Sequence, residues 1–160
     1  MARWGVRILV GVLLLVGCAK YAYSSEALFV LACDQMEVDC TDLAPPKIVY
    51  LDPEDPILDG ALGIYYGSDD PDRIFVRDDY TGLWMSEVIY HETIHYVQHH
   101  LGDTQIPNVP KLICPLEAQA FELSERFMNA NLPEDKHVDY SNWYLPYIYC
   151  WPQYAPVFTP

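Results

Sequence analysis

Basic residues are scarce in this 160-residue chain. It has nine Lys and Arg against 23 Asp and Glu, a formal net charge of −14 at pH 7. A chain of this sign repels phosphate backbones, so nucleic acid is not an expected partner. Charged residues make up only 20% of the chain and apolar residues 51%, which excludes an intrinsically disordered polypeptide. The sequence shows no internal repeat, and its length suits a single domain.

The first 17 residues contain no acidic residue. Arg3 and Arg7 form a short basic region, and residues 8–16 form an apolar run that is too short for a comfortable bilayer span of about 20 residues. This pattern predicts a secretory signal peptide over residues 1–17. Once it is removed, the remaining chain carries seven basic and 23 acidic residues, a net charge of −16.

The end of this segment resembles the lipobox of bacterial lipoproteins. An aliphatic Leu15 and a small Gly17 precede Cys18, which in that family is lipidated and becomes the new N-terminus. The alternatives are an ordinary signal peptide cleaved near Ala22 and an uncleaved anchor. The resemblance implies a lipid-anchored protein of the bacterial cell envelope. Because Ala19 is not acidic, it implies the outer membrane or periplasm.

The cysteines show no Cys-x-x-Cys pair, so we do not expect a zinc site built from cysteine. Five is an awkward number for an exported protein, but lipidation of Cys18 leaves four. An oxidising compartment then allows two disulfides in three connectivities, and we favour Cys33–Cys40 and Cys114–Cys150. The alternative for each cysteine is a small buried apolar residue.

Apolar patterns and turn residues predict an α+β fold. β-Branched and aromatic runs predict strands at 47–51, 62–66 and 73–77. Caps and prolines predict helices from Ser24 or Ser25 to near Gln35, from Ser86 to about Leu101 and from Pro115 to Asn131. We divide the chain after the signal peptide into a tether and first helix (18–46), a core (47–131) and a Tyr- and Pro-rich tail packed on it (132–160).

A His-Glu-x-x-His motif lies within the second expected helix. His91 and His95 are four residues apart, so they share one helical face and both imidazoles can reach one metal ion. Glu92 is rotated by about 100° from His91, where it can accept a proton from a water molecule that the metal activates. The alternatives are a chance match and a helix with surface histidines, such as the nearby His99 and His100.

A catalytic zinc site usually has three protein ligands. Glu117 is the favoured third ligand, because it lies 22 residues beyond His95, enough for a loop and an antiparallel return. Glu122 and His99 are the alternatives. One straight helix rarely supplies three ligands to a tetrahedral ion, which weakens the case for His99.

These residues resemble the gluzincin branch of zinc metallopeptidases and, more narrowly, a group of small bacterial and phage-associated proteins without an established function. The residues that carry the resemblance are His91, Glu92, His95, Gln98, Cys114, Glu117, Ala120 and Phe121. The resemblance covers about residues 47–131. It implies a minimal zincin-like domain, in which a small sheet packs against the motif helix and a following helix bears the glutamate. It further implies zinc bound by His91, His95 and Glu117, with Glu92 as general base.

The leading functional hypothesis is an exported zinc-dependent hydrolase, a metallopeptidase that acts on a peptide or protein. One alternative is an exported binding or structural lipoprotein with a non-catalytic zinc site, and another is a structural lipoprotein without metal. By residue type, His137, Tyr140 and Tyr144 are candidates to stabilise an oxyanion, although aromatic packing is the alternative for both tyrosines. The strand at 73–77 would offer its edge to an extended substrate, or it is an ordinary sheet strand.

If Cys18 carries the lipid, Cys18→Ala should block maturation or release the protein from membranes, because no other cysteine stands directly after the apolar run. The measurement is the membrane-bound fraction and the mass of the processed chain. Unchanged partition together with unchanged processing would refute lipidation.

Overall fold

The computed structural model of the chain describes residues 23–101 and 110–140. The predicted signal peptide, Cys18, Tyr144 and Cys150 lie outside these residues, and so does the side chain of Cys114.

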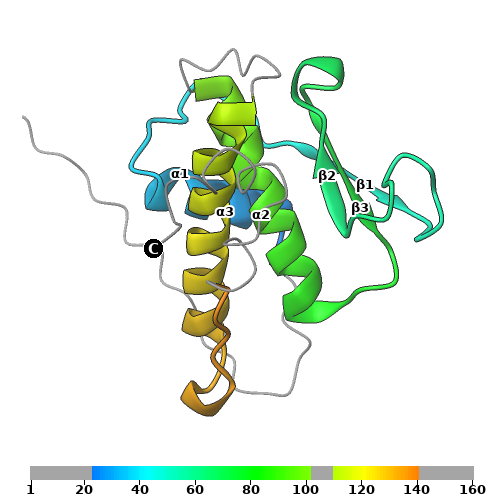
Figure 1. Cartoon of the computed structure of the whole chain (residues 1–160). Helices are drawn as coiled ribbons and strands as arrows, with labels where there is room; N and C mark the ends of the chain where they lie inside the picture. The colour runs from blue at the N-terminus through cyan, green and yellow to red at the C-terminus, as the bar shows by residue number, and fades with distance from the viewer. Residues whose placement is uncertain (1–22, 102–109, 141–160) are drawn as a thin grey trace, which may run out of the picture.

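The described chain is a mixed α+β fold, as the sequence predicts (Figure 1). Its helices are α1 (Ser25–Gln35), α2 (Gly82–Leu101) and α3 (Pro110–Asn131), and its strands are β1 (Lys47–Leu51), β2 (Gly63–Tyr65) and β3 (Arg73–Arg77). Two 3₁₀ turns follow β2 and α3, η1 (Gly67–Asp69) and η2 (Glu134–Lys136). Within residues 23–101 and 110–140, no helix combines the length and apolar character needed to cross a bilayer.

The three strands form one sheet in the order β1-β3-β2. β1 runs parallel to β3, and β2 pairs with β3 antiparallel. β3 is therefore the central strand, and the prediction that residues 73–77 offer an open edge to a substrate is wrong. The burial of Ile74, Phe75 and Val76 fits this place, because a central strand covered on both faces is apolar without alternation.

Helix α2 lies at the centre of the fold. It packs against β2 and β3 on one side and against α1 and α3 on the other (Figure 1). Buried side chains from all of these layers except β2 form one apolar core, with members that include Leu28, Ile74, Val76, Tyr90, Ile94, Val97, Ala120, Phe127 and Met128. Burial of this surface holds the layers together and fixes the position of α2 between them.

The predicted helix starts need two corrections. Ser86 does not cap α2, which begins at Gly82; the Ser86 hydroxyl donates to the Gly82 carbonyl and accepts from the Tyr23 amide. Helix α3 begins at Pro110 rather than Pro115, since Pro110 takes the first helical position, to which proline is suited. By contrast, Ser24 caps α1 as predicted, and its hydroxyl accepts the Ala27 amide at 3.2 Å.

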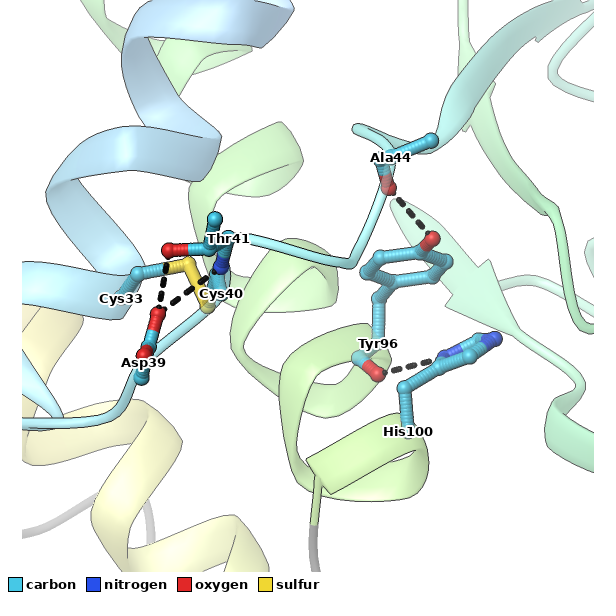
Figure 2. Close-up of a disulfide and its surroundings, with 7 residues drawn as sticks. All are labelled: Cys33, Asp39, Cys40, Thr41, Ala44, Tyr96 and His100. Atoms are coloured by element: carbon cyan, nitrogen blue, oxygen red, sulfur yellow. Dashed lines mark hydrogen bonds between the residues drawn. A yellow bond between two sulfur atoms is a disulfide. The ribbon is translucent and has the colours of Figure 1, made fainter.

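The predicted Cys33–Cys40 disulfide is confirmed (Figure 2). It joins the last turn of α1 to the loop that leads to β1. Further along that loop, the Ala44 carbonyl accepts the Tyr96 hydroxyl of α2 at 2.6 Å. The loop between α1 and β1 is therefore fastened to both helices before it enters the sheet.

Strand β2 approaches α2 closely at Gly63. A Cβ atom at this position would lie 2.7 Å from Cγ1 of Val88 and 3.0 Å from Cγ of Glu92. Real Cβ atoms almost never come so near to another carbon, so the approach of the edge strand to the helix requires a residue without a side chain.

Gly63→Ala should therefore destabilise the fold by about 1–3 kcal/mol, as other overpacked sites do. The measurement is the free energy of unfolding in denaturant. Val88→Ala removes the nearest clashing atom, so the double variant should lose less stability than the sum of the two single variants. A Gly63→Ala protein as stable as the unaltered chain would contradict this close approach.

Candidate metal centre

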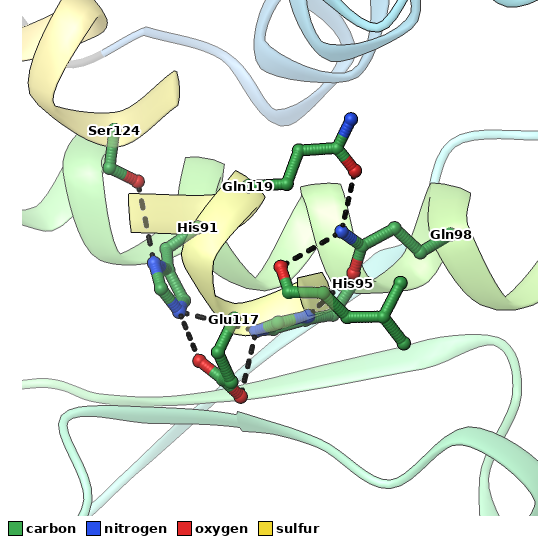
Figure 3. A network of polar contacts seen from close by, with 7 residues as sticks. His91, His95, Gln98, Glu117, Gln119 and Ser124 are labelled. Atoms are coloured by element: carbon green, nitrogen blue, oxygen red, sulfur yellow. Dashed lines mark hydrogen bonds and ion pairs between the residues drawn. The ribbon is translucent and has the colours of Figure 1, made fainter. Parts of the chain in front are cut away.

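Three potential metal ligands converge between α2 and α3 (Figure 3). The Nε2 atoms of His91 and His95 are 3.2 Å apart. The two carboxylate oxygens of Glu117 lie 3.5 Å from Nε2 of His91 and 3.3 Å from Nε2 of His95. Two imidazoles and a carboxylate that meet in this way could hold a metal ion.

The positions of the three side chains follow from the two helices. His91 and His95 lie one turn apart on the face of α2 that meets α3, and Glu117 projects from α3 toward them (Figure 3). Ala120 is fully buried one turn beyond Glu117, where its small side chain permits the helices to approach each other.

The structure does not bring the two alternative third ligands to this group. Glu122 is exposed on α3 and forms an ion pair with Arg126. His99 packs its ring against Tyr65 of β2 and against His100. The favoured choice of Glu117 thus agrees with the geometry.

Several neighbours of the histidines received no role in the sequence analysis. Nδ1 of His95 lies 2.8 Å from Oε1 of Gln98, and Nδ1 of His91 lies 3.4 Å from the Ser124 hydroxyl. The Phe121 ring packs edge-on against the His91 ring at 4.5 Å. The sequence analysis names Gln98, three residues after His95, only as part of the resemblance, and nothing in the sequence indicates the contact of Ser124.

Glu92 lies beside the three ligands and is almost entirely buried, with 9% of its surface exposed. Burial raises the pKa of its carboxyl, and the charge of Glu117 adds to the rise, while His91, His95 and the Tyr65 backbone amide act in the opposite direction. The Tyr65 N–H belongs to β2 and donates to the Glu92 carboxylate. The edge strand therefore helps to hold this side chain in place.

The charges of the three ligands depend on one another. Burial disfavours the charged form of His95, but its contacts with Glu117 outweigh this effect and, with smaller contributions from Glu92 and Gln98, raise its pKa to about 9. Burial likewise disfavours the charged form of Glu117, but hydrogen bonds from His91 and His95 hold the pKa of its carboxyl well below the usual range. Glu117 and His95 therefore each favour the charged form of the other.

The described candidates for oxyanion stabilisation have other contacts. The Tyr140 ring packs against Phe121, and its hydroxyl is hydrogen-bonded to the Glu87 carboxyl, whose pKa is raised by burial. The Tyr140 amide donates to Glu125. His137 is exposed and directly follows η2. Tyr140 therefore has the aromatic packing role that the sequence analysis gave as the alternative.

Comparison with protein-family models, with curated proteins and with solved structures gives no match for this chain. The resemblance to gluzincins therefore stays a prediction from the motif, and the case for a metal centre depends on the geometry of the site.

Removal of any one ligand should weaken metal binding. His91→Ala, His95→Ala and Glu117→Ala should each lower the zinc content from the one ion per chain that we expect of the unaltered protein. Zinc at about a hundred times its Kd should stabilise the unaltered fold by about 2.7 kcal/mol, and the three variants should lose most of this gain. The measurements are zinc per chain and melting temperature with and without zinc.

Glu122→Ala is the matched control, because it removes an exposed carboxylate from the same helix. It should bind zinc as the unaltered protein does. Full zinc occupancy in His91→Ala would contradict a metal centre at this place.

Proposed function

We propose that the protein is a zinc-dependent hydrolase and that its substrate is a peptide or protein. The observation that carries this proposal is the position of Glu92 next to the convergent His91, His95 and Glu117. A purely structural metal site has no need of a buried carboxylate that is not a ligand, whereas hydrolysis by an activated water requires a base beside the metal.

Zinc fits the donor set and its dimensions. Imidazole nitrogens and a carboxylate oxygen are ordinary zinc ligands, and catalytic sites use three of them and leave a fourth position open. In a tetrahedral site with bonds of about 2.0–2.1 Å, ligand atoms lie about 3.3 Å apart. Here the two Nε2 atoms are 3.2 Å apart, while one carboxylate oxygen of Glu117 lies 3.3 Å from Nε2 of His95 and the other lies 3.5 Å from Nε2 of His91. The three side chains therefore need little movement to accept the ion.

When bound, zinc supplies a Lewis acid that polarises the substrate carbonyl and makes water a better nucleophile at neutral pH. Glu92 accepts the proton of the attacking water and later delivers it to the leaving amine. The Tyr65 amide orients the Glu92 carboxylate for this transfer. The burial of Glu92 keeps bulk water away from it, which strengthens its interactions with nearby charges.

The edge of β2 supports a peptide as substrate. The Leu62 carbonyl accepts from the Arg77 amide of β3, so by alternation the backbone groups of Gly63 and Tyr65 face the other side of β2. That side lies next to Glu92, which already accepts the Tyr65 amide. An extended peptide added along this edge would pass the metal centre.

We also propose that the protein acts outside the cytoplasm, held to a membrane by lipid on Cys18. The signal-like sequence of residues 1–17 supports export. The Cys33–Cys40 disulfide supports it independently, because structural disulfides persist in oxidising compartments.

Glu92→Gln should separate hydrolysis from metal binding. The amide keeps the shape of the side chain and can still accept the Tyr65 N–H, but it cannot take a proton from water. Zinc content should stay at one per chain, while cleavage of a peptide library should fall by about 10²–10⁴-fold.

Glu122→Gln, an exposed carboxylate on α3, is the matched control and should cleave at the unaltered rate. If the zinc-loaded protein cleaves nothing, or if Glu92→Gln cleaves normally, the hydrolase proposal fails. The remaining hypothesis would then be a binding module with a non-catalytic zinc site.

A further inference from the structure

Gln98 links the two helices of the metal centre. It lies three residues after His95 on α2 and only 4% of its surface is exposed. Its Oε1 atom is 2.8 Å from Nδ1 of His95. Its Nε2 atom donates to the Leu116 carbonyl at 3.0 Å and to Oε1 of Gln119 at 2.9 Å, both on α3 (Figure 3).

The Leu116 carbonyl fixes which way the Gln98 amide points. A backbone carbonyl only accepts hydrogen bonds, so the group that faces it must be the NH₂ end of the amide. Rotation of the amide by half a turn would set Oε1 of Gln98 against the carbonyl oxygen of Leu116 and would break a buried hydrogen bond. The Oε1 atom of Gln98 must therefore face His95.

This orientation in turn fixes the tautomer of His95. Because Oε1 of Gln98 only accepts, Nδ1 of His95 must carry a hydrogen. The lone pair of a neutral His95 then lies on Nε2, the atom that faces Glu117 and His91. Gln98 thus selects the form of His95 that can bind a metal at Nε2.

The second contact of Gln98 acts on the other helix. Leu116 directly precedes Glu117. The hydrogen bond from Gln98 to the Leu116 carbonyl therefore holds the backbone of α3 next to the third candidate ligand. One buried amide therefore orients a ligand on α2 and positions a ligand on α3. Ser124 does not fix the tautomer of His91 in the same way. Its hydroxyl can either donate or accept, and it lies 3.4 Å from Nδ1 of His91.

We infer that Gln98 is a positioning residue of the metal centre, which leaves the lone pair of a neutral His95 on Nε2 and holds Glu117 opposite it. This inference depends on metal binding by the site of the proposed function, but not on hydrolysis. Second partners of ligating histidines commonly contribute about 10–100-fold to metal affinity.

The test compares Gln98→Met with the unaltered protein, because methionine keeps the length of the side chain and removes the hydrogen bonds to His95, Leu116 and Gln119. Zinc alone is the probe, and circular dichroism verifies that each variant is folded. The zinc Kd of Gln98→Met should rise by about 10–100-fold. In the zinc-loaded protein, the NMR signal of the His95 Nδ1 proton should be lost through faster exchange with water.

Two further variants make the result specific. Gln98→Glu restores an acceptor for the His95 N–H, so it should recover the proton signal and part of the zinc affinity. Ser124→Ala removes the corresponding neighbour of His91 and should change the zinc Kd by less than about threefold, since that contact is long. If Gln98→Met does not fold, Gln98→Glu serves as the test. The inference then predicts that the His95 Nδ1 proton signal is retained in this variant.

A zinc Kd within threefold of the unaltered value in Gln98→Met, or a His95 proton signal that does not change in it, would overturn the inference. Loss of the signal in Gln98→Glu would overturn it as well. Zinc binding that depends on Gln98 in a protein that cleaves nothing would leave the inference standing while the hydrolase proposal fails. An unaltered protein that binds no zinc would overturn both.

Discussion

The packing of α2 against α3 is the constraint on which the candidate site depends. His91 and His95 are placed by one helix and Glu117 by the other, so the three ligand atoms meet only while the helices stay in this relation. Apolar burial supplies the general attraction, and fully buried Ala120 marks a close contact near Glu117. The Gln98 amide fixes the orientation of the helices at the site, because its hydrogen bonds join His95 of α2 to Leu116 and Gln119 of α3.

The sheet contributes a second boundary of the site. β2 is an edge strand whose Gly63 lets it lie against α2, and its Tyr65 amide reaches the Glu92 carboxylate. Glu92 is thus held between helix and sheet, while the three candidate metal ligands are held between two helices. This division fits the separate roles that we propose for them, since a base must stay beside the metal without becoming a ligand.

Much of the site could be predicted from the sequence because its geometry is local. The spacing of His91 and His95 sets their common face, and the length of chain before Glu117 permits a helix to return. Features that depend on distant residues were missed. Ser86 looks like a cap, yet it lies inside the helix, where its hydroxyl accepts the amide of the distant Tyr23 and bonds back to the Gly82 carbonyl. A short apolar run at 73–77 indicates a strand but not its neighbours, so its central place could not be foreseen. The need for glycine at position 63 arises from Val88 and Glu92, which are remote in sequence.

X-ray absorption at the zinc edge of the purified, zinc-loaded protein tests the central claim most directly. The account predicts a first shell of nitrogen and oxygen atoms at about 2.0–2.2 Å, with the outer-shell scattering of two imidazoles and no sulfur. Scattering from sulfur at about 2.3 Å, or from no imidazole, would contradict a centre built from His91, His95 and Glu117.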